Sequence, residues 1–372
     1  MTNDARHAPA FRPGKDSAAA EGGCMQLTFK YRIKDKYAAR LNAQARAVNL
    51  VWNFCNETQQ KAVRSGRKWL SGNDLWKLVA GATRDGLDLH SHSAMRACKE
   101  YDKARRQHKK PWLRWRGRKS LGWVPFNTGH VAFRNGAFVF RGEMYHVWLH
   151  RPLPDDAKIG AGSFNQDSHG RWYLNVTVEV ETATFASIAK VGIDLGLDSL
   201  VAFSTGETIE APRFYRKSEE ALATAQRARK TKHARRIHAK ARNRREYFLH
   251  KKSKEIARKY GLIVVGDVSP KKIAQSRFAK SVHDASWANL KQMLSYKALM
   301  HGGSMLQVCE RYTSQSCSEC GCLPASRPRG IAGLRKRVFA CDDCGAVLDR
   351  DVNAARNILA RGQASLGGGA HV

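Results

Sequence analysis

The period of apolar and polar positions changes several times along the chain, and each change predicts a new element. Residues 25–34 alternate apolar and polar side chains, as in a strand with one buried face. Residues 37–64 instead carry apolar side chains at helical spacing, and a second helix is predicted over residues 91–107. Short alternating segments broken by Gly, Asn and Pro then predict antiparallel strands in a small β-barrel or open sheet. These strands are expected at residues 131–133, 137–140, 147–149 and 172–180.

The pattern changes again in the second half of the chain, where longer apolar runs predict buried strands. One run ends at Asp194, and a hairpin of two strands is expected at residues 200–210. Residues 216–259 form a long helical stretch with almost no turn signal. Further strands at residues 261–268 and 305–310 flank a helix at residues 282–300, so an α/β domain is predicted.

Charge indicates the kind of partner. The 372 residues include 65 Lys and Arg against 32 Asp and Glu, a formal net charge of +33. Such a surplus repels itself unless a polyanion neutralises it, and the usual polyanion is nucleic acid. Residues 216–259 hold 17 Lys or Arg and 4 Asp or Glu, so this stretch is the predicted phosphate-binding surface. A merely solvated helical face is the alternative.

Targeting signals are missing from the printed chain. It contains no run of about 18 apolar residues that could span a membrane. Residues 1–24 are rich in Ala, Gly and charge and are predicted to be a disordered leader, with Met1 or Met25 as the start of translation. Without a secretory signal, thiols are expected to stay reduced, which favours a cytoplasmic protein of a prokaryotic cell, associated with the nucleoid when bound.

Four cysteines have the spacing of a zinc ribbon. Two Cys-x-x-Cys pairs are separated by 20 residues, and each is followed by a glycine that permits a tight turn. Four thiolates leave no open position for water, so one structural zinc ion is predicted. Cys322 is expected to be a bystander, and the fourteen histidines show no ligand spacing, so no metal is assigned to them. The predicted zinc ligands are Cys317, Cys320, Cys341 and Cys344.

Two carboxylates stand at the ends of predicted elements. Asp194 closes the apolar strand Val191-Gly-Ile-Asp-Leu-Gly, an opening typical of RNase H-like nuclease cores, where such an Asp binds divalent metal. Asp351 begins a helix directly after the second cysteine pair. By themselves these residues could equally be a turn or N-cap residue and a helix-start residue favoured by the helix dipole.

Six motifs follow one another in a characteristic order after Val191. They are Gly192-Ile-Asp-Leu-Gly196, the basic helix ending in His250-Lys251, Ser286-Trp-x-x-Leu290, Leu294-x-Tyr-Lys297, Thr313-Ser-Gln-x-Cys317 and Asp349-Arg-Asp-Val-Asn-Ala-Ala-Arg-Asn-Ile358. With this order of motifs, the chain resembles the TnpB (OrfB) family of transposon-encoded proteins, relatives of the type V CRISPR effector nucleases. The resemblance covers roughly residues 25–361.

The resemblance implies an RNA-guided DNA endonuclease that cuts double-stranded target DNA beside a short flanking motif. A guide RNA from the protein's own transposon locus would select the target, and two Mg²⁺ ions would support phosphodiester hydrolysis. By matching motif positions, Asp194 and Asp351 become the first and third catalytic carboxylates. The expected nucleic-acid-binding residues are Arg227, Arg229, Lys230, Arg235, Arg236, Arg242, Arg244, Arg245, His250 and Lys251.

The second catalytic position departs from the family pattern. In that pattern a Glu ends the second buried strand, whereas here the stretch Val264-Val-Gly-Asp-Val268 has Gly266 at that place. Glu310, at the end of the neighbouring strand, is the favoured substitute. Asp267 is a weaker one because side chains alternate across a strand. A protein that binds its target under RNA guidance but no longer cuts is the alternative function.

The predicted architecture has two parts. Residues 25–188 form an N-terminal, wedge-like β-barrel with an inserted helical nucleic-acid-binding region. Residues 189–372 form an RNase H-like (RuvC) domain that contains the zinc ribbon at about residues 313–348 and a disordered tail from about residue 362.

Overall fold

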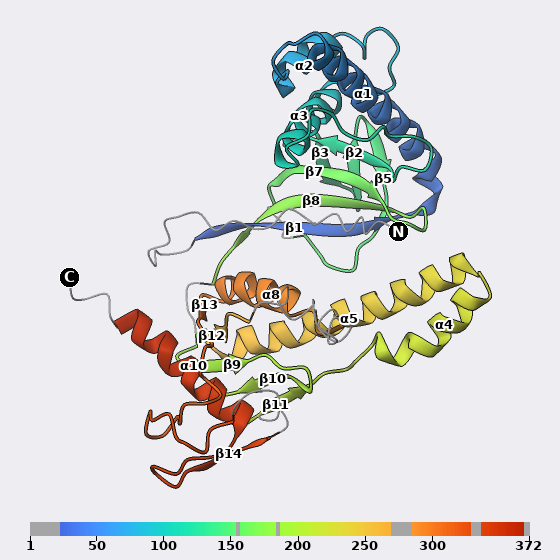
Figure 1. Ribbon diagram of the computed structural model, residues 1–372. Coiled ribbons are helices and arrows are strands. Elements are labelled where there is room, and N and C mark those ends of the chain that lie inside the picture. The colour runs from blue at the N-terminus through green and yellow to red at the C-terminus, as the bar shows by residue number, and fades with distance from the viewer. Residues whose placement is uncertain (1–22, 154–156, 184–186, 269–283, 329–335, 368–372) are drawn as a thin grey trace. The chain divides into compact units, whose positions relative to one another are not determined.

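The computed structural model describes residues 23–153, 157–183, 187–268, 284–328 and 336–367, and the statements below refer to these residues (Figure 1). The chain divides into two compact units. The first is Cys24–Val180, and the second begins at Glu181. Each unit is described by itself.

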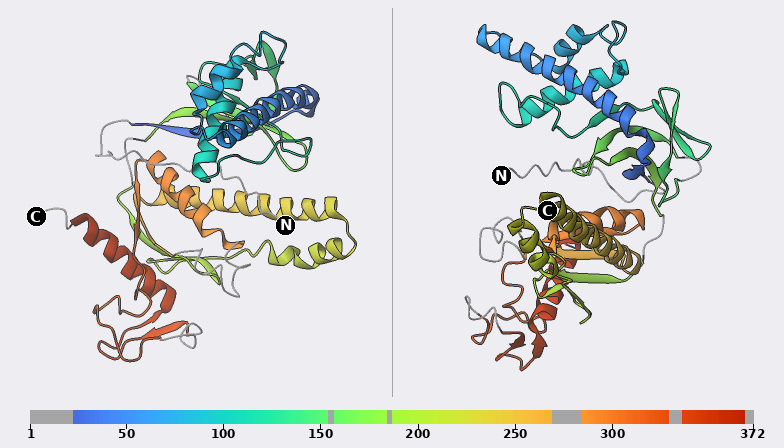
Figure 2. Two further views of the ribbon diagram at one scale, coloured as in Figure 1. Left: turned by 45° about the horizontal axis from the view of Figure 1, so that its top comes forward. Right: turned by 90° about the vertical axis from the view of Figure 1, so that its right-hand side faces the viewer.

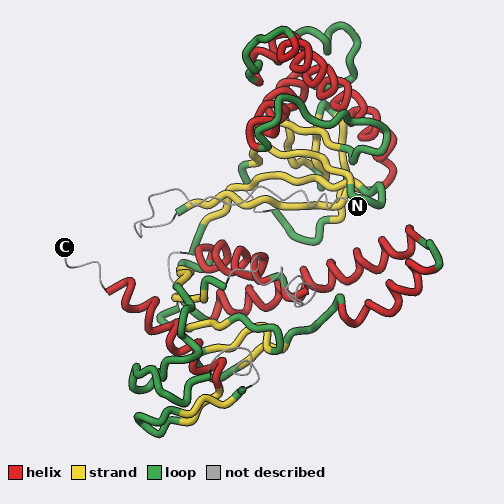
Figure 3. The backbone as a smooth tube through the Cα atoms, viewed as in Figure 1, coloured by secondary structure: helices red, strands yellow, loops and turns green. Residues whose placement is uncertain are grey.

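The first unit combines helices with strands (Figure 3). Along the chain, a long strand precedes three helices and a series of strands. Two sheets result, one of five strands in the order β2-β7-β8-β1-β6 and one of three strands in the order β3-β4-β5. The elements are β1 (Cys24–Ile33), α1 (Ala38–Arg64), α2 (Gly72–Val79), α3 (Ser91–Gln107), β2 (Trp123–Phe126), β3 (Val131–Arg134), β4 (Ala137–Phe140), β5 (Glu143–Tyr145), β6 (Val147–Trp148), β7 (Ile159–Gln166) and β8 (Trp172–Glu181).

An aromatic core joins the two sheets of the first unit. Phe164 of β7 lies 5.3 Å, between ring centroids, from Phe140 of β4 and from Tyr145 of β5. Phe126 of β2 packs against the same cluster, and these rings are almost completely buried. Large buried rings contribute much of the hydrophobic stabilisation of a small domain. The alternating burial of β1, with every second residue inside, follows the predicted pattern.

The predicted strand and helices of residues 25–107 are present as β1, α1 and α3, and the structure adds α2. The side chain of Ser71 accepts a hydrogen bond from the Asp74 backbone N–H, and the Asp74 carboxylate accepts one from the Ser71 backbone N–H. This capping box is readable in the sequence as Ser-x-x-Asp and could have identified the helix. Strands β2, β5 and β7 were also not predicted as separate elements.

The second unit is built on a five-stranded mixed sheet of order β11-β10-β9-β12-β13. The three strands β9, β12 and β13 run parallel, and β10 and β11 run antiparallel to their neighbours. The unit contains β9 (Lys190–Asp194), β10 (Ser199–Phe203), β11 (Thr208–Glu210), α4 (Glu219–Arg227), α5 (Thr231–Lys259), β12 (Leu262–Gly266), α8 (Trp287–Met300), β13 (Ser304–Val308), β14 (Val338–Ala340), β15 (Val347–Asp349) and α10 (Arg350–Gly367).

Helices cover both faces of this sheet (Figure 2). Helices α5 and α8 pack on the face that carries Ile193 and Val265, and α10 packs on the face that carries Val264. A Cβ atom on Gly192 would lie 2.0 Å from the Ala355 carbonyl oxygen, so only glycine lets α10 approach the centre of β9 this closely. Since side chains alternate along a strand, Asp194 shares the α10 face with Gly192.

Helices α4 and α5 form a hairpin that extends from the sheet (Figure 1). The single long helix predicted for residues 216–259 is therefore interrupted at Ala228–Lys230. Arg229 adopts a left-handed backbone conformation with φ 53°, and the Lys230 N–H donates to the Ala225 carbonyl. This geometry closes a helix C-terminus, and it was missed because no Gly or Asn marks it.

At the C-terminal end, one prediction is wrong. The tail expected to be disordered from about residue 362 is helical as far as Gly367. Gly362 is buried, and a Cβ atom there would lie 2.4 Å from Val264 Cγ2, so this turn of α10 packs on the sheet. The predicted leader, residues 1–24, lies outside the described residues except at its end, where Cys24 begins β1. Within the described part of the chain, none of the helices has the length and apolar character needed to cross a membrane.

Candidate active site

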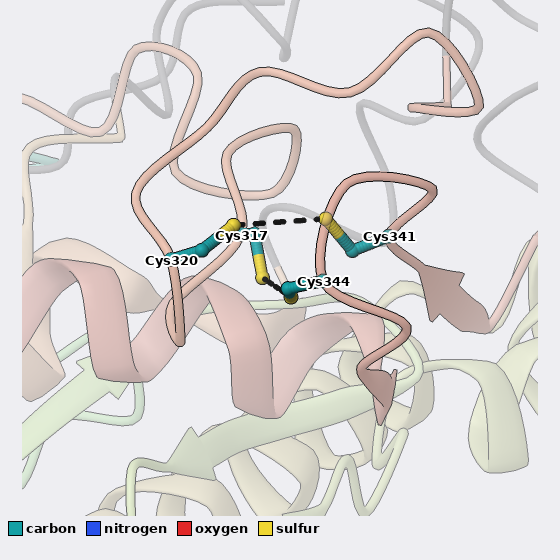
Figure 4. Close-up of side chains that lie close together, drawn as sticks. All are labelled: Cys317, Cys320, Cys341 and Cys344. Atoms are coloured by element: carbon teal, nitrogen blue, oxygen red, sulfur yellow. Dashed lines mark hydrogen bonds between the residues drawn. The ribbon is translucent and has the colours of Figure 1, made fainter.

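The four predicted metal-binding cysteines come together in the second unit (Figure 4). The sulfur of Cys317 lies 3.6 Å from that of Cys344, and the sulfur of Cys320 lies 3.7 Å from that of Cys341. Four thiolates bound to zinc at about 2.3 Å in a tetrahedron would be about 3.8 Å apart. The sulfur cluster therefore has the dimensions of a tetrahedral metal site.

The two cysteine turns share one backbone design. After each pair a glycine, Gly321 or Gly345, adopts a positive φ, 77° or 74°, and donates its N–H to the carbonyl of the first cysteine. In the first turn the Cys317 backbone N–H also donates a hydrogen bond to the Cys322 carbonyl. Cys322 itself stays outside the four-cysteine cluster. Each turn is thus set by a few consecutive residues.

Helix α10 supports the first cysteine turn through two asparagines that the sequence analysis did not single out. Asn353 Oδ1 accepts the Ser318 backbone N–H at 2.8 Å. The side-chain amides of Asn353 and Asn357 both donate to the Ser316 carbonyl at 2.8 Å. Asn353 is fully buried, so these hydrogen bonds replace lost contacts with water. The spacing of four residues, which puts both side chains on one helix face, was the available sequence signal.

Asp194 ends β9 at the α10 face of the sheet. Burial raises the pKa of its carboxyl group, and the negative charges of Asp351 and Glu310 raise it further. The nearby Arg350 guanidinium and the Leu195 backbone N–H oppose this effect, and the resulting pKa is about 7. Asp351 and Glu310 thus lie close enough to Asp194 to act on its charge, so the three sequence-predicted carboxylates gather in one region.

Glu310 occupies the space beside Gly266. A Cβ atom built on Gly266 would lie 2.9 Å from Glu310 Oε2 and 3.3 Å from Glu310 Cβ. Gly266 is also in register with Val308 of the neighbouring parallel strand, two residues before Glu310. A glutamate at position 266 and the present conformation of Glu310 therefore exclude each other. The pKa of Glu310 is raised by burial first and by the Asp267 charge second.

Asp267 is placed differently from Glu310. It is exposed, and its Oδ1 accepts the Glu310 backbone N–H at 3.2 Å. It contributes to the pKa of Glu310, whereas the groups that shift Asp194 are Asp351, Glu310 and Arg350. Asp267 therefore contacts the backbone that carries Glu310, and it is not among the groups that shift the pKa of Asp194.

Asp351 lies in the first turn of α10 but does not cap the helix. The side chain of Asp349 takes that role, because its Oδ1 accepts the backbone N–H groups of Asp351 and Val352 at 2.9 and 3.0 Å. The Asp351 carboxylate instead accepts from Arg350 at 3.2 Å and from Arg337 at 3.1 Å. Arg337 also pairs with Asp198. Two arginines therefore balance the negative charge of Asp351.

The predicted nucleic-acid-binding residues follow the α4–α5 hairpin. Arg229, Lys230 and Arg236 line a shallow hollow near the start of α5. Arg245 is different from the others, because it is half-buried and pairs with the buried Asp284 at 3.4 Å. The other residues of the predicted set have exposed side chains: Arg227, Arg229, Lys230, Arg235, Arg236, Arg242, Arg244, His250 and Lys251. Exposed cationic side chains are therefore distributed along the whole length of the hairpin.

Two family models match the chain, mostly within the second unit. Residues 173–277 match the OrfB_IS605 family, described as a probable transposase. Residues 287–358 match the TNB domain described as Cas12f1-like. The second match contains all four clustered cysteines as well as Glu310 and Asp351.

Relatives with related names are similar over more than half of the chain. A Streptomyces pristinaespiralis protein named as an RNA-guided DNA endonuclease is 36% identical over 266 residues, which are 67% of this chain and 64% of that protein. InsQ of Escherichia coli (strain K12) is also named as an RNA-guided DNA endonuclease. It is 32% identical over 229 residues, which are 54% of this chain and 56% of that protein. The matched parts thus span less than two thirds of these relatives.

The fold matches that of a solved effector complex. The Cas12f1 chain in the Cas12f1–sgRNA–target DNA complex aligns with a TM-score of 0.56 at 14% identity, over 87% of this chain and 82% of that one. The fold is accordingly Cas12f1-like, with mixed sheets and helices. The resemblance to the TnpB (OrfB) family is confirmed: the chain is related to TnpB-like proteins and to Cas12f1.

Proposed function

We propose that this protein is an RNA-guided DNA endonuclease of the TnpB type, which cuts double-stranded target DNA beside a short flanking motif. The second unit is then an RNase H-like (RuvC) nuclease domain with an inserted zinc ribbon. The two sheets of the first unit act as a barrel-like wedge whose helices hold nucleic acid. The names of the relatives support the reaction, and the clustered carboxylates support the place where it occurs.

The observation that carries the proposal is the position of Glu310 beside Gly266. The side chain that the family pattern expects at position 266 is missing, and Glu310 Oε2 lies 2.9 Å from where that side chain would begin. Glu310 also acts on the charge of Asp194, as Asp351 does. The acid set of the site is therefore Asp194, Glu310 and Asp351, with one member supplied by the neighbouring strand.

The three carboxylates suit hard divalent cations. Their oxygens are the ligands that Mg²⁺ prefers. The pKa of Asp194, about 7, is raised by burial first and by the charges of Asp351 and Glu310 second, and a bound cation would offset both effects. When bound, two Mg²⁺ ions would stabilise charge on the attacking and leaving oxygens of the phosphodiester. Asp194 and Glu310, held at strand ends, and Asp351, held by the helix start, would fix that site. Arg337 and Arg350 would balance Asp351 before the site is loaded.

The remaining groups would bind nucleic acid or maintain structure. One zinc ion bound by the four cysteines would fix the ribbon and, through Asn353 and Asn357, the start of α10. The exposed cations of the α4–α5 hairpin would contact the backbone of a guide RNA paired with its target strand. Recognition of this kind depends on shape and charge and weakens steeply with salt.

A binding protein without cleavage activity is the second candidate, because Gly266 removes the usual acid. The two candidates differ in what Glu310 does. In a binding protein this side chain would have no role in the reaction, and its substitution would leave target binding unchanged.

A cleavage assay separates the candidates. The protein is purified with the RNA transcribed from its own locus, and a plasmid library carrying the matching target receives Mg²⁺. We expect guide-dependent cleavage by the wild type, loss of cleavage in Asp194→Asn and Glu310→Gln, and unchanged guide-dependent DNA binding in both. Glu207→Gln is the matched control, because Glu207 is an exposed acid of the same unit, paired with Lys259.

Binding without cleavage in the wild type would overturn the nuclease proposal and favour the second candidate. Cleavage that survives Glu310→Gln but is lost in Asp267→Asn would instead overturn the assignment of the second acid. Replacing Mg²⁺ with Ca²⁺, which binds similar oxygens but adopts looser geometry, should retain DNA binding and abolish cleavage.

A further inference from the structure

Three histidines of the first unit gather at one point that the proposed nuclease function does not use. His90 is the N-cap residue of α3, His92 lies in the first turn of that helix, and His130 comes directly before β3. One nitrogen from each ring lies within 4.8 Å of the others. The ring centroids are 4.4 Å apart for His92 and His130, and 4.6 Å apart for His90 and His130.

We propose that His90, His92 and His130 bind a divalent transition-metal ion, zinc in the cell, which ties the start of α3 to the loop between β2 and β3. Imidazole nitrogen is a preferred ligand of Zn²⁺, Co²⁺, Ni²⁺ and Cu²⁺. Three protein ligands would leave a fourth position for water. The proposal concerns the first unit alone and is independent of the nuclease proposal.

The surrounding structure holds two of the rings in place. The carbonyl of His90 accepts the backbone N–H groups of Ser93 and Ala94, and its ring packs against Phe140, which is almost fully buried. On the other side, the His130 N–H donates to the Asn127 carbonyl, and the Asn127 side chain accepts from Arg96 of α3 at 3.5 Å. Only His92 is exposed, so it is the ring that can adjust.

The required adjustment is small. Nitrogens bound to zinc at 2.0–2.1 Å in a tetrahedron are about 3.4 Å apart, whereas here they lie within 4.8 Å of one another. Rotation of the exposed His92 side chain can shorten the two separations that involve it, and a small shift of the His90 or His130 ring would shorten the third.

Two features of the site oppose a cation and set a limit on affinity. The Nδ1 atom of His90 accepts the His92 backbone N–H at 3.2 Å, and metal binding through either ring nitrogen ends this cap, because the lone pair or the tautomer changes. Arg141 also acts on His90, although its charge is paired with Asp88 at 2.9 Å. We therefore expect weaker binding here than at the four cysteines, so that a mild chelator removes this ion first.

The test measures metal content of the full chain, purified without a polyhistidine tag and dialysed against micromolar zinc. We expect two zinc ions per chain in the wild type and one in His92→Gln and in His130→Gln. His108→Gln is the matched control, because His108 is an exposed histidine at the other end of the same helix, and it should retain two. His90 is left unchanged, since its side chain caps α3.

Cobalt distinguishes the two sites by their donors. A Co²⁺ ion at four thiolates has sulfur-to-metal charge-transfer absorption, whereas a second Co²⁺ at imidazoles adds only ligand-field bands. We expect the wild type to bind a second Co²⁺ ion with the spectrum of imidazole ligands. In His92→Gln the affinity for this second ion should be at least tenfold lower. One ion per chain in the wild type, or two in both histidine variants, would overturn the proposal.

Discussion

The four-cysteine cluster and the carboxylate cluster lie in the same unit but are assembled in opposite ways. Each half of the cysteine cluster is one short turn. Its glycine and the hydrogen bond from that glycine to the carbonyl of the first cysteine lie within a few consecutive residues. The carboxylates instead come from the end of one strand, from beyond the end of another and from the start of a helix. The difference is that local sequence determines the first site, whereas the packing of the sheet and α10 determines the second.

The comparison also extends to charge. The thiolates of a closed site are satisfied by a single ion, and their spacing of 3.6 and 3.7 Å already suits it. The carboxylates repel one another, which contributes to the raised pKa of Asp194. Like-charged side chains that lie near one another are typical of catalytic centres, where groups needed for function lower the stability of the fold.

The largest effect is expected at the cysteines. In Cys341→Ser one zinc ligand is lost, and the free energy of metal binding that holds the ribbon is lost with it. We expect one zinc ion fewer per chain, a large drop in melting temperature of the second unit and no cleavage. Metal analysis and calorimetry check this, and Cys322→Ser is the matched control because Cys322 lies outside the cluster. A folded, active Cys341→Ser protein would contradict the assignment of a structural site.

A swap of the second acid tests the carboxylates without disturbing the fold. Glu310→Ala should reduce the single-turnover cleavage rate by about 10³-fold, equivalent to several kcal/mol of transition-state stabilisation. Gly266→Glu alone should also be impaired, because the new side chain meets Glu310. The double variant Gly266→Glu/Glu310→Ala restores a single acid in the same space and should recover at least about a tenth of the wild-type rate. A double variant as slow as Glu310→Ala would show that position 266 does not reach the site.

The smallest effect is a gain in stability. The folded-state pKa of Asp194, about 7, lies above the usual value of 3.8, so ionisation of this group opposes folding. Stability from this residue is complete below about pH 4 and is lost as the pH rises to 7. Without divalent cations, Asp194→Asn should therefore be more stable than the wild type by at most roughly 4 kcal/mol at pH 8, at about 1.4 kcal/mol for each pKa unit. Urea unfolding at pH 4 and pH 8 checks this, and an equal difference at both pH values would contradict it.

Much of the fold follows from local sequence. The alternating residues of β1 and the helical period of α1 and α3 gave their bounds to within one or two residues, because burial of one face determines both patterns. The short strands β2 and β5 are too brief for a period to be visible. The break at Arg229 depends on a left-handed residue that is neither Gly nor Asn, so no sequence signal marks it.

The candidate sites follow the same division. The clustering of the cysteines could be predicted from their spacing alone. The proposal of Glu310 rather than Asp267 depends instead on the positions of the two side chains relative to Gly266 and to the backbone, which the sequence does not give. The three histidines were not assigned any metal from sequence, because two come from α3 and one from a distant loop. Only the packing of α3 beside β2 and β3 brings their rings together.

The asparagines of α10 imply a constraint on length. Asp351, Asn353 and Asn357 lie on one helix, so the acid and the support of the first cysteine turn are fixed at set angles about one axis. Inserting or deleting one residue between Asp351 and Asn357 would rotate them by about 100° relative to each other. Substitutions in this stretch affect single contacts, but a change in its length would disconnect the ribbon from the carboxylates. In genetic terms, an in-frame insertion or deletion in this segment should be more damaging than a conservative substitution at one of its positions.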